Sequence, residues 1–120
     1  MENAAASGIF HRLHSVRHTP CSYIPFECKN YSNEVANPEL DQLAGRFGVN
    51  RGQVGFLLCR RFEDRARFVQ RCRDTFRDAR GLIVGLHDAA ITRLLQHIEQ
   101  GDRPAADVEI GRLIDEVWLA

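Results

Sequence analysis

The stretch 23-YIPFECKNYSNEV-35 combines a short apolar segment with a glutamate and a lysine two residues apart. Side chains alternate between the two faces of an extended chain, so residues i and i+2 share a face. We therefore expect a strand over residues 23–29, with Glu27 and Lys29 on one face. Phe26 is expected on the opposite face, packed against the core.

Lys29 is the single lysine of a sequence whose other fifteen basic residues are arginines. Lysine offers a compact ammonium where arginine offers a planar fork, so Lys29 marks a position where the compact group is preferred. Glu27 can supply an oxygen ligand to Mg²⁺, and Lys29 can orient a water or offset charge on a phosphate. The alternative is an ordinary surface ion pair.

The chain after residue 35 alternates between helical and strand-like patterns, joined by short links. Continuous apolar runs predict buried strands, and Asn, Asp and Pro mark helix starts. Crossover connections between such strands give a parallel sheet flanked by helices. The pattern thus predicts an α/β fold with a small, mixed or parallel, three-layer core. Its strands are expected over 23–29, 53–59 and 81–86, with helices over 38–47, 64–79, from Asp88 and from Pro104.

The length of 120 residues suits one domain. We expect a helix and loop over residues 1–22, a core over 23–86, and a helical pair over 87–120. The first helix of that pair is expected to bury Ile91, Leu94, Leu95 and Ile98.

Targeting and redox signals are sparse in this sequence. Four cysteines without paired spacing suit reduced thiols. No apolar run is long enough to span a membrane, and the first residues lack the features of a signal peptide. The sequence therefore predicts a cytoplasmic protein without a membrane partner.

Positive charge is concentrated in the middle of the chain. Residues 51–80 hold nine arginines against four acidic residues, although the formal net charge of the protein is zero. Such a segment can face a polyanion such as DNA, or it can be a solvated face with local ion pairs. Arg67 and Arg71 lie one helical turn apart, off the predicted buried stripe, and are candidates for phosphate contacts.

Three quoted stretches together carry a family resemblance: FECKNYS (26–32), NPELDQLAGRF (37–47) and GFLLCRR (55–61). Over about residues 20–86 the sequence resembles the core of the PD-(D/E)xK nuclease superfamily, which has the restriction-endonuclease-like fold. It is similar in particular to such domains in bacterial defence and DNA-processing proteins.

The resemblance implies Mg²⁺-dependent hydrolysis of DNA phosphodiesters. Glu27 would be a metal ligand and Lys29 the catalytic lysine, with the backbone carbonyl of Cys28 as a further contributor to the metal site. Gln42 lies where some branches of the family place a glutamine on the following helix, which gives it a supporting role.

The sequence departs from the family pattern ahead of Glu27. The family places an acidic residue on the preceding strand, but residues 3–26 contain neither Asp nor Glu, and only Glu2 comes earlier. The core therefore looks partly incomplete. Either the sequence is a piece of a longer nuclease, or it is a degenerate relative that keeps the fold for binding DNA or a protein partner. Both interpretations predict little or no nuclease activity alone.

A second constellation suggests metal chemistry of another kind. His11, His14, His18 and Cys21 follow the spacing H-x2-H-x3-H-x2-C, and the three histidines share a helical face. Imidazole and thiolate are zinc ligands, so a zinc-stabilised module is one reading. The other is a set of exposed histidines, and we expect no zinc.

Overall fold

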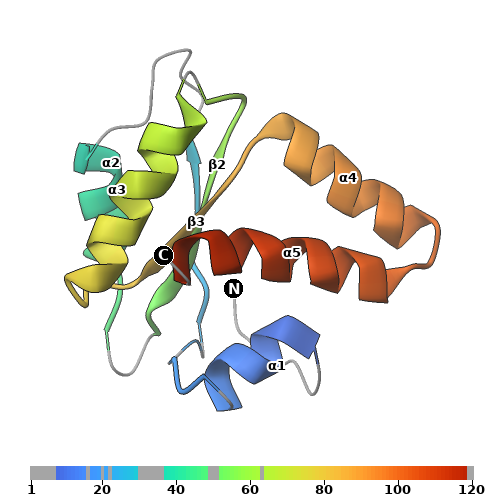
Figure 1. Cartoon of the computed structure of the whole chain (residues 1–120), viewed down its shortest axis with the longest axis horizontal. Coiled ribbons are helices and arrows are strands. Elements are labelled where there is room, and N and C mark those ends of the chain that lie inside the picture. Colours follow the sequence, from blue (N-terminus) through green and yellow to red (C-terminus); the bar gives the residue numbers. More distant parts are fainter. Residues whose placement is uncertain are drawn as a thin grey trace.

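The computed structural model describes residues 8–15, 17–19, 21, 23–29, 37–48, 52–62 and 64–118 (Figure 1). Helices and strands alternate through the centre of the chain, and two helices close it. In chain order the elements are α1 (Gly8–Ser15), β1 (Phe26–Lys29), α2 (Asn37–Ala44), β2 (Val54–Cys59), α3 (Arg65–Arg77), β3 (Leu82–Leu86), α4 (Asp88–Glu99) and α5 (Arg103–Trp118).

The three strands form one sheet in the order β1-β2-β3, and both strand pairs are parallel. Phe26 pairs with Phe56, and Phe56 pairs with Val84. The predicted α/β class and the single parallel sheet are confirmed. Pro25 directly precedes β1, and its carbonyl accepts a hydrogen bond from the amide of Phe56 at 3.0 Å. A proline is tolerated at a strand start, because the missing donor lies outside the ladder.

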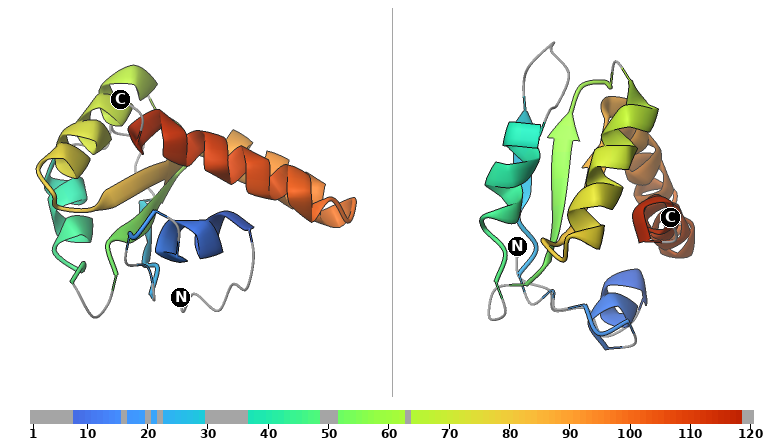
Figure 2. Two further views of the ribbon diagram at one scale, coloured as in Figure 1. Left: turned by 60° about the horizontal axis from the view of Figure 1, so that its bottom comes forward. Right: turned by 60° about the vertical axis from the view of Figure 1, so that its left-hand side comes forward.

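Helices cover both faces of the sheet, which gives three layers (Figure 2). On one face Phe47, just after α2, lies against Gly55 and Gly81, and Phe68 of α3 lies against Gly85. Gly81 has a positive φ of 126°, and a Cβ there would collide with the ring of Phe47. The glycine thus allows α2 and its following turn to approach the sheet closely.

The opposite face of the sheet is covered by α5 and α1. Phe10 of α1 meets Phe56 of β2 edge-on, with ring centroids 6.0 Å apart. At its carboxyl end α5 also contacts α3, where Phe76 and Trp118 lie 4.9 Å apart between centroids. The strand β3 therefore lies within a continuous apolar shell formed by α3 and α5.

Two of the predicted helix starts have different outcomes. Asp64 caps α3 as predicted, because its carboxylate accepts from the amide of Arg67 at 3.0 Å. Asp88 does not cap α4. His87 takes that position, and its Nδ1 accepts from the amide of Ala90 at 3.2 Å, while Asp88 is the first helical residue. A neutral imidazole can accept at one nitrogen, which makes it an adequate cap.

Two burial predictions were wrong. Phe26 is 40% exposed, although it stacks on Phe56, because β1 is an outer strand whose face is only partly covered. In α4, Leu95 and Ile98 are 60% and 55% exposed. This helix packs chiefly against α5 and extends beyond the sheet with it (Figure 1). The single neighbouring helix α5 covers only part of the apolar stripe of α4.

Membrane-spanning helices are absent from the described ranges, where every helix is too short or too polar to cross a bilayer.

Candidate functional site

The carboxyl ends of the three strands meet at one edge of the sheet, because all three run in the same direction. Lys29 ends β1 in register with Cys59, which ends β2 and is followed by Arg60 and Arg61. The amide of Asp88, just after β3, donates to the carbonyl of Arg60 at 3.2 Å. Ligands of parallel α/β sheets bind outside the carboxyl ends of the strands. This edge is therefore the candidate site.

Glu27 lies on the face of β1 that α2 covers, in register with Leu57 of β2. Its Oε2 lies 2.8 Å from Nη1 of Arg46, in the turn that follows α2. The side chain of Glu27 is 20% exposed and that of Arg46 is 57% exposed. Sequence reasoning missed this pair, since nothing in NPELDQLAGRF distinguishes Arg46 from any other surface arginine.

Lys29 lies two positions after Glu27 on β1, with their Cα atoms about 6–7 Å apart along the strand. Its side chain lies outside the described part of the structure. Cys28, between them, has an exposed side chain on the opposite face. The shared face of Glu27 and Lys29 therefore stays a prediction from strand alternation.

Gln42 and Glu2, the two residues assigned supporting roles, keep those roles as predictions. The side chain of Gln42 on α2 is exposed, whereas its neighbour Leu43 is fully buried. Glu2 falls outside the described residues. Glu27 is therefore the carboxylate of β1 around which the site must be built.

Metal ligands are not gathered anywhere in the described ranges, which hold no cluster of three or more His, Cys, Asp or Glu side chains suited to an ion. Mg²⁺ binding normally draws on more than one anchoring oxygen group. A single carboxylate that already pairs with a guanidinium does not fit that requirement. The described residues alone therefore do not make a magnesium site.

Two members of the histidine and cysteine constellation, His14 and Cys21, make local structural contacts. Nδ1 of His14 accepts from the amide of Cys21 at 3.3 Å, and Sγ of the buried Cys21 lies 3.7 Å from the carbonyl oxygen of Phe10. His18 is exposed and adopts a positive φ of 55°. These contacts fasten the segment after α1 to that helix.

Cys59 and Cys72 are buried in the core. Burial raises the pKa of Cys59 to about 11, with a smaller contribution from the negative charge of Asp88. Burial alone raises the pKa of Cys72 to about 12. Both thiols remain protonated at neutral pH, so they act as packing groups and not as nucleophiles.

Some arginines of residues 60–80 form ion pairs, and others are exposed without one in the described residues. Arg65 and Arg80 form ion pairs of 2.6 Å with Glu116 and Asp41, so local pairing accounts for part of the basic segment. Arg67 is exposed and makes no ion pair within the described residues, whereas Arg71 is half-buried. Arg61 and Arg77 are also exposed, without an ion pair in that part of the chain.

Comparisons with known proteins found no protein-family model, no curated protein and no solved structure that matches the chain.

Proposed function

We propose that this protein is a DNA-binding module with the restriction-endonuclease-like fold, whose site lies at the carboxyl edge of the sheet. One observation carries the proposal. β1 carries Glu27 and ends two positions later at Lys29, and its parallel neighbour β2 ends in register with Lys29 and continues into two arginines. A strand, a helix and a parallel strand in this order agree with the core that the sequence resembles.

Phosphate contacts would come from the cations around this edge. Lys29 ends β1, Arg61 follows β2, and Arg67 lies in the first turns of α3, which begins beside the same edge. Arginine and lysine side chains that contact phosphates release counterions, so the affinity falls steeply with salt. DNA in the cytoplasm is the proposed partner, and binding by the chain alone is expected to be weak.

Hydrolysis in this proposal requires more than the described residues offer. Glu27 alone holds Mg²⁺ poorly, and Arg46 competes for its carboxylate. A second acidic group, from another segment or from a partner, would have to join Glu27. The chain by itself is therefore proposed to cut DNA slowly or not at all.

A non-catalytic interaction module of a bacterial defence or DNA-processing system is the second candidate. The ion pair between Glu27 and Arg46 favours it, because the guanidinium binds the carboxylate that a nuclease would need as a metal ligand. In this alternative the edge binds DNA or a partner without chemistry.

DNA binding can be tested by fluorescence anisotropy with labelled duplex and single-stranded DNA over a salt series. Lys29→Ala, Arg61→Ala and Arg67→Ala should each weaken binding several-fold and lower the salt slope by about one. Arg77→Ala is the matched control, because it removes the same charge at the other end of α3. Equal losses in all four variants, or no binding at low salt, would reject the proposed edge.

Cleavage is tested with Mg²⁺ and Mn²⁺ on the same DNA. We expect little or none from the parent chain. Robust cleavage that both Glu27→Ala and Lys29→Ala abolish would show that the chain is catalytically complete and would still support the site. Cleavage that neither substitution affects would come from a contaminant and would leave the nuclease interpretation without support.

A further inference from the structure

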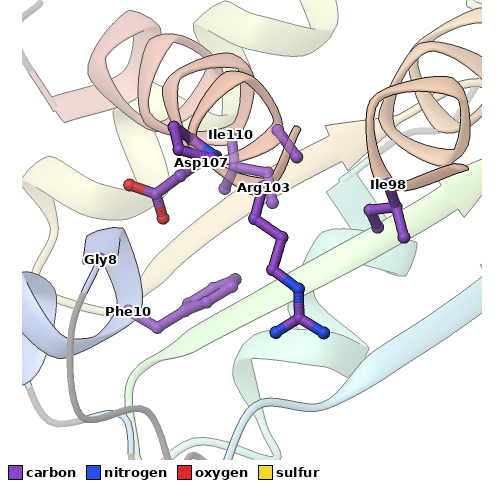
Figure 3. A pocket seen from close by; sticks show the side chains of 8 residues that line it. Gly8, Phe10, Ile98, Arg103, Asp107 and Ile110 are labelled. Carbon is purple, nitrogen blue, oxygen red and sulfur yellow. The ribbon is translucent and has the colours of Figure 1, made fainter. Parts of the chain in front are cut away.

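A hollow of about 570 Å³ is lined by residues of α1, of the end of α4 and of the first part of α5 (Figure 3). Small-molecule sites in proteins typically enclose about 300–1,000 Å³. The hollow belongs to none of the elements that carry Glu27 or Lys29. Any ligand here would therefore be separate from the proposed DNA site.

The walls of the hollow are mainly apolar. Phe10 comes from α1, Ile98 from α4 and Ile110 from α5, so three helices contribute to one surface. Ile98 is 55% exposed, although it belongs to the apolar stripe of its helix. An apolar ligand would cover Ile98 and remove this surface from water, which favours binding.

The two charged side chains that line the hollow, Arg103 and Asp107, differ in whether they have a partner. Arg103 and Asp107 are one turn apart on α5, a spacing at which such residues often pair. Asp107 instead accepts hydrogen bonds from the amide of Ile9 at 2.7 Å and from Arg12 at 3.1 Å. Arg103 makes no ion pair within the described residues. Figure 3 shows its guanidinium extended between Phe10 and Ile98, away from Asp107.

We propose that this hollow binds a small amphiphilic carboxylate, with one negative charge and about eight to ten carbon atoms in total. The carboxylate would lie on Arg103, whose planar fork matches it with two parallel hydrogen bonds. The aliphatic part would lie on Phe10, Ile98 and Ile110. The carboxylate of Asp107 at the other end disfavours a second negative charge on the ligand, and thereby fixes its orientation.

Octanoate is the probe, measured by isothermal titration calorimetry on the full chain. It is compared with suberate, which carries a second carboxylate, and with octylammonium, which reverses the charge. We expect saturable one-to-one binding of octanoate, and binding at least about tenfold weaker for the other two ligands. Amide shifts in a nuclear magnetic resonance titration should cluster at the ends of α1, α4 and α5 that face the hollow.

Two substitutions separate charge from apolar contact. Arg103→Met keeps most of the aliphatic stem and should weaken octanoate about tenfold, with little change for 1-octanol. Ile98→Ser lies at an exposed position, so folding should be preserved, and both ligands should bind more weakly. Arg77→Met, with the same charge change on α3, is the control and should leave both affinities unchanged.

Several results would overturn the proposal. Equal affinity for octanoate and octylammonium would remove the role of Arg103, as would an unchanged affinity in Arg103→Met. Amide shifts centred on another surface would show that octanoate binds there and not in the hollow. Concentration-dependent dimers in analytical ultracentrifugation, lost in Ile98→Ser and accompanied by no octanoate binding, would instead identify a second copy of the chain as the occupant.

Discussion

The two outer strands of the sheet, β1 and β3, have the same topological position but opposite surroundings. Every residue of β3 except Gly85 is buried, and α3 and α5 cover its two faces. In β1, Phe26 and Cys28 are exposed, and Glu27 forms an ion pair with an exposed arginine. The buried and the partly exposed outer strand thus lie on opposite sides of β2.

Coverage by helices, and not position in the sheet, explains this difference. The helices α3 and α5 also contact each other, with Phe76 beside Trp118 and Arg73 bonded to the carbonyl of Glu116 at 2.8 Å. No such pair of helices encloses β1 within the described part of the chain. An outer strand left partly uncovered keeps polar side chains near solvent, which a binding site requires.

The largest expected contrast is in thiol reactivity. Cys28 on β1 is exposed and should react rapidly with a disulfide reagent at pH 8. Cys59 is buried and its pKa is raised to about 11, so about one molecule in a thousand carries the thiolate at that pH. Cys72, with a pKa of about 12, should react still more slowly. Labelling followed by peptide mass spectrometry measures each rate.

Cys28→Ser should abolish the rapid phase of labelling and leave the slow phases of the buried thiols.

Because burial raises the pKa of Cys59 and Cys72, the unfolded chain loses these protons first as the pH rises. The free energy of unfolding should therefore fall as the pH rises above about 9. Rapid labelling of Cys59 or Cys72 under native conditions would show that the core around β2 and α3 opens readily.

A second contrast compares core truncations in the two outer strands. Ile83 of β3 is fully buried, so Ile83→Ala should cost about 3 kcal/mol in the free energy of unfolding. Phe26→Ala in β1 should cost about 1 kcal/mol, since the ring is 40% exposed and loses mainly its stacking on Phe56. Urea denaturation followed by circular dichroism measures both, and equal losses would contradict the comparison.

The smallest expected effect concerns the ion pair of Glu27 and Arg46. A double-mutant cycle with Glu27→Ala and Arg46→Ala should give a coupling free energy of about 0.5 kcal/mol, because Arg46 is 57% exposed. The Arg80–Asp41 pair, with both side chains about half exposed, is the matched reference. A coupling above about 2 kcal/mol would make the pair structural and would weaken the proposed site.

Much of the fold could be predicted because its signals are local. The apolar runs at residues 53–59 and 81–86 and the alternation at 23–29 each contain a strand of the observed sheet. Asp64 before α3 predicted its cap. Short links between strands and helices then left a parallel sheet as the compact solution.

The candidate site was predicted only in part. The expected strand is observed, and it holds both Glu27 and Lys29. The partner of Glu27 was not predicted, because Arg46 lies 19 positions later, beyond a helix, and sequence spacing does not specify a contact of that kind. The helix that Gln42 was expected to share with the site exists, but the side chain is exposed.

By itself, the sequence determined which residues form helices and strands and which of them share a face. Only the tertiary structure decided which faces are covered. It left Ile98 partly in water, directed Asp107 to the amide of Ile9, and left Arg103 without an acidic partner in the described residues. Periodicity is a property of neighbouring residues, whereas burial depends on where distant helices pack against them.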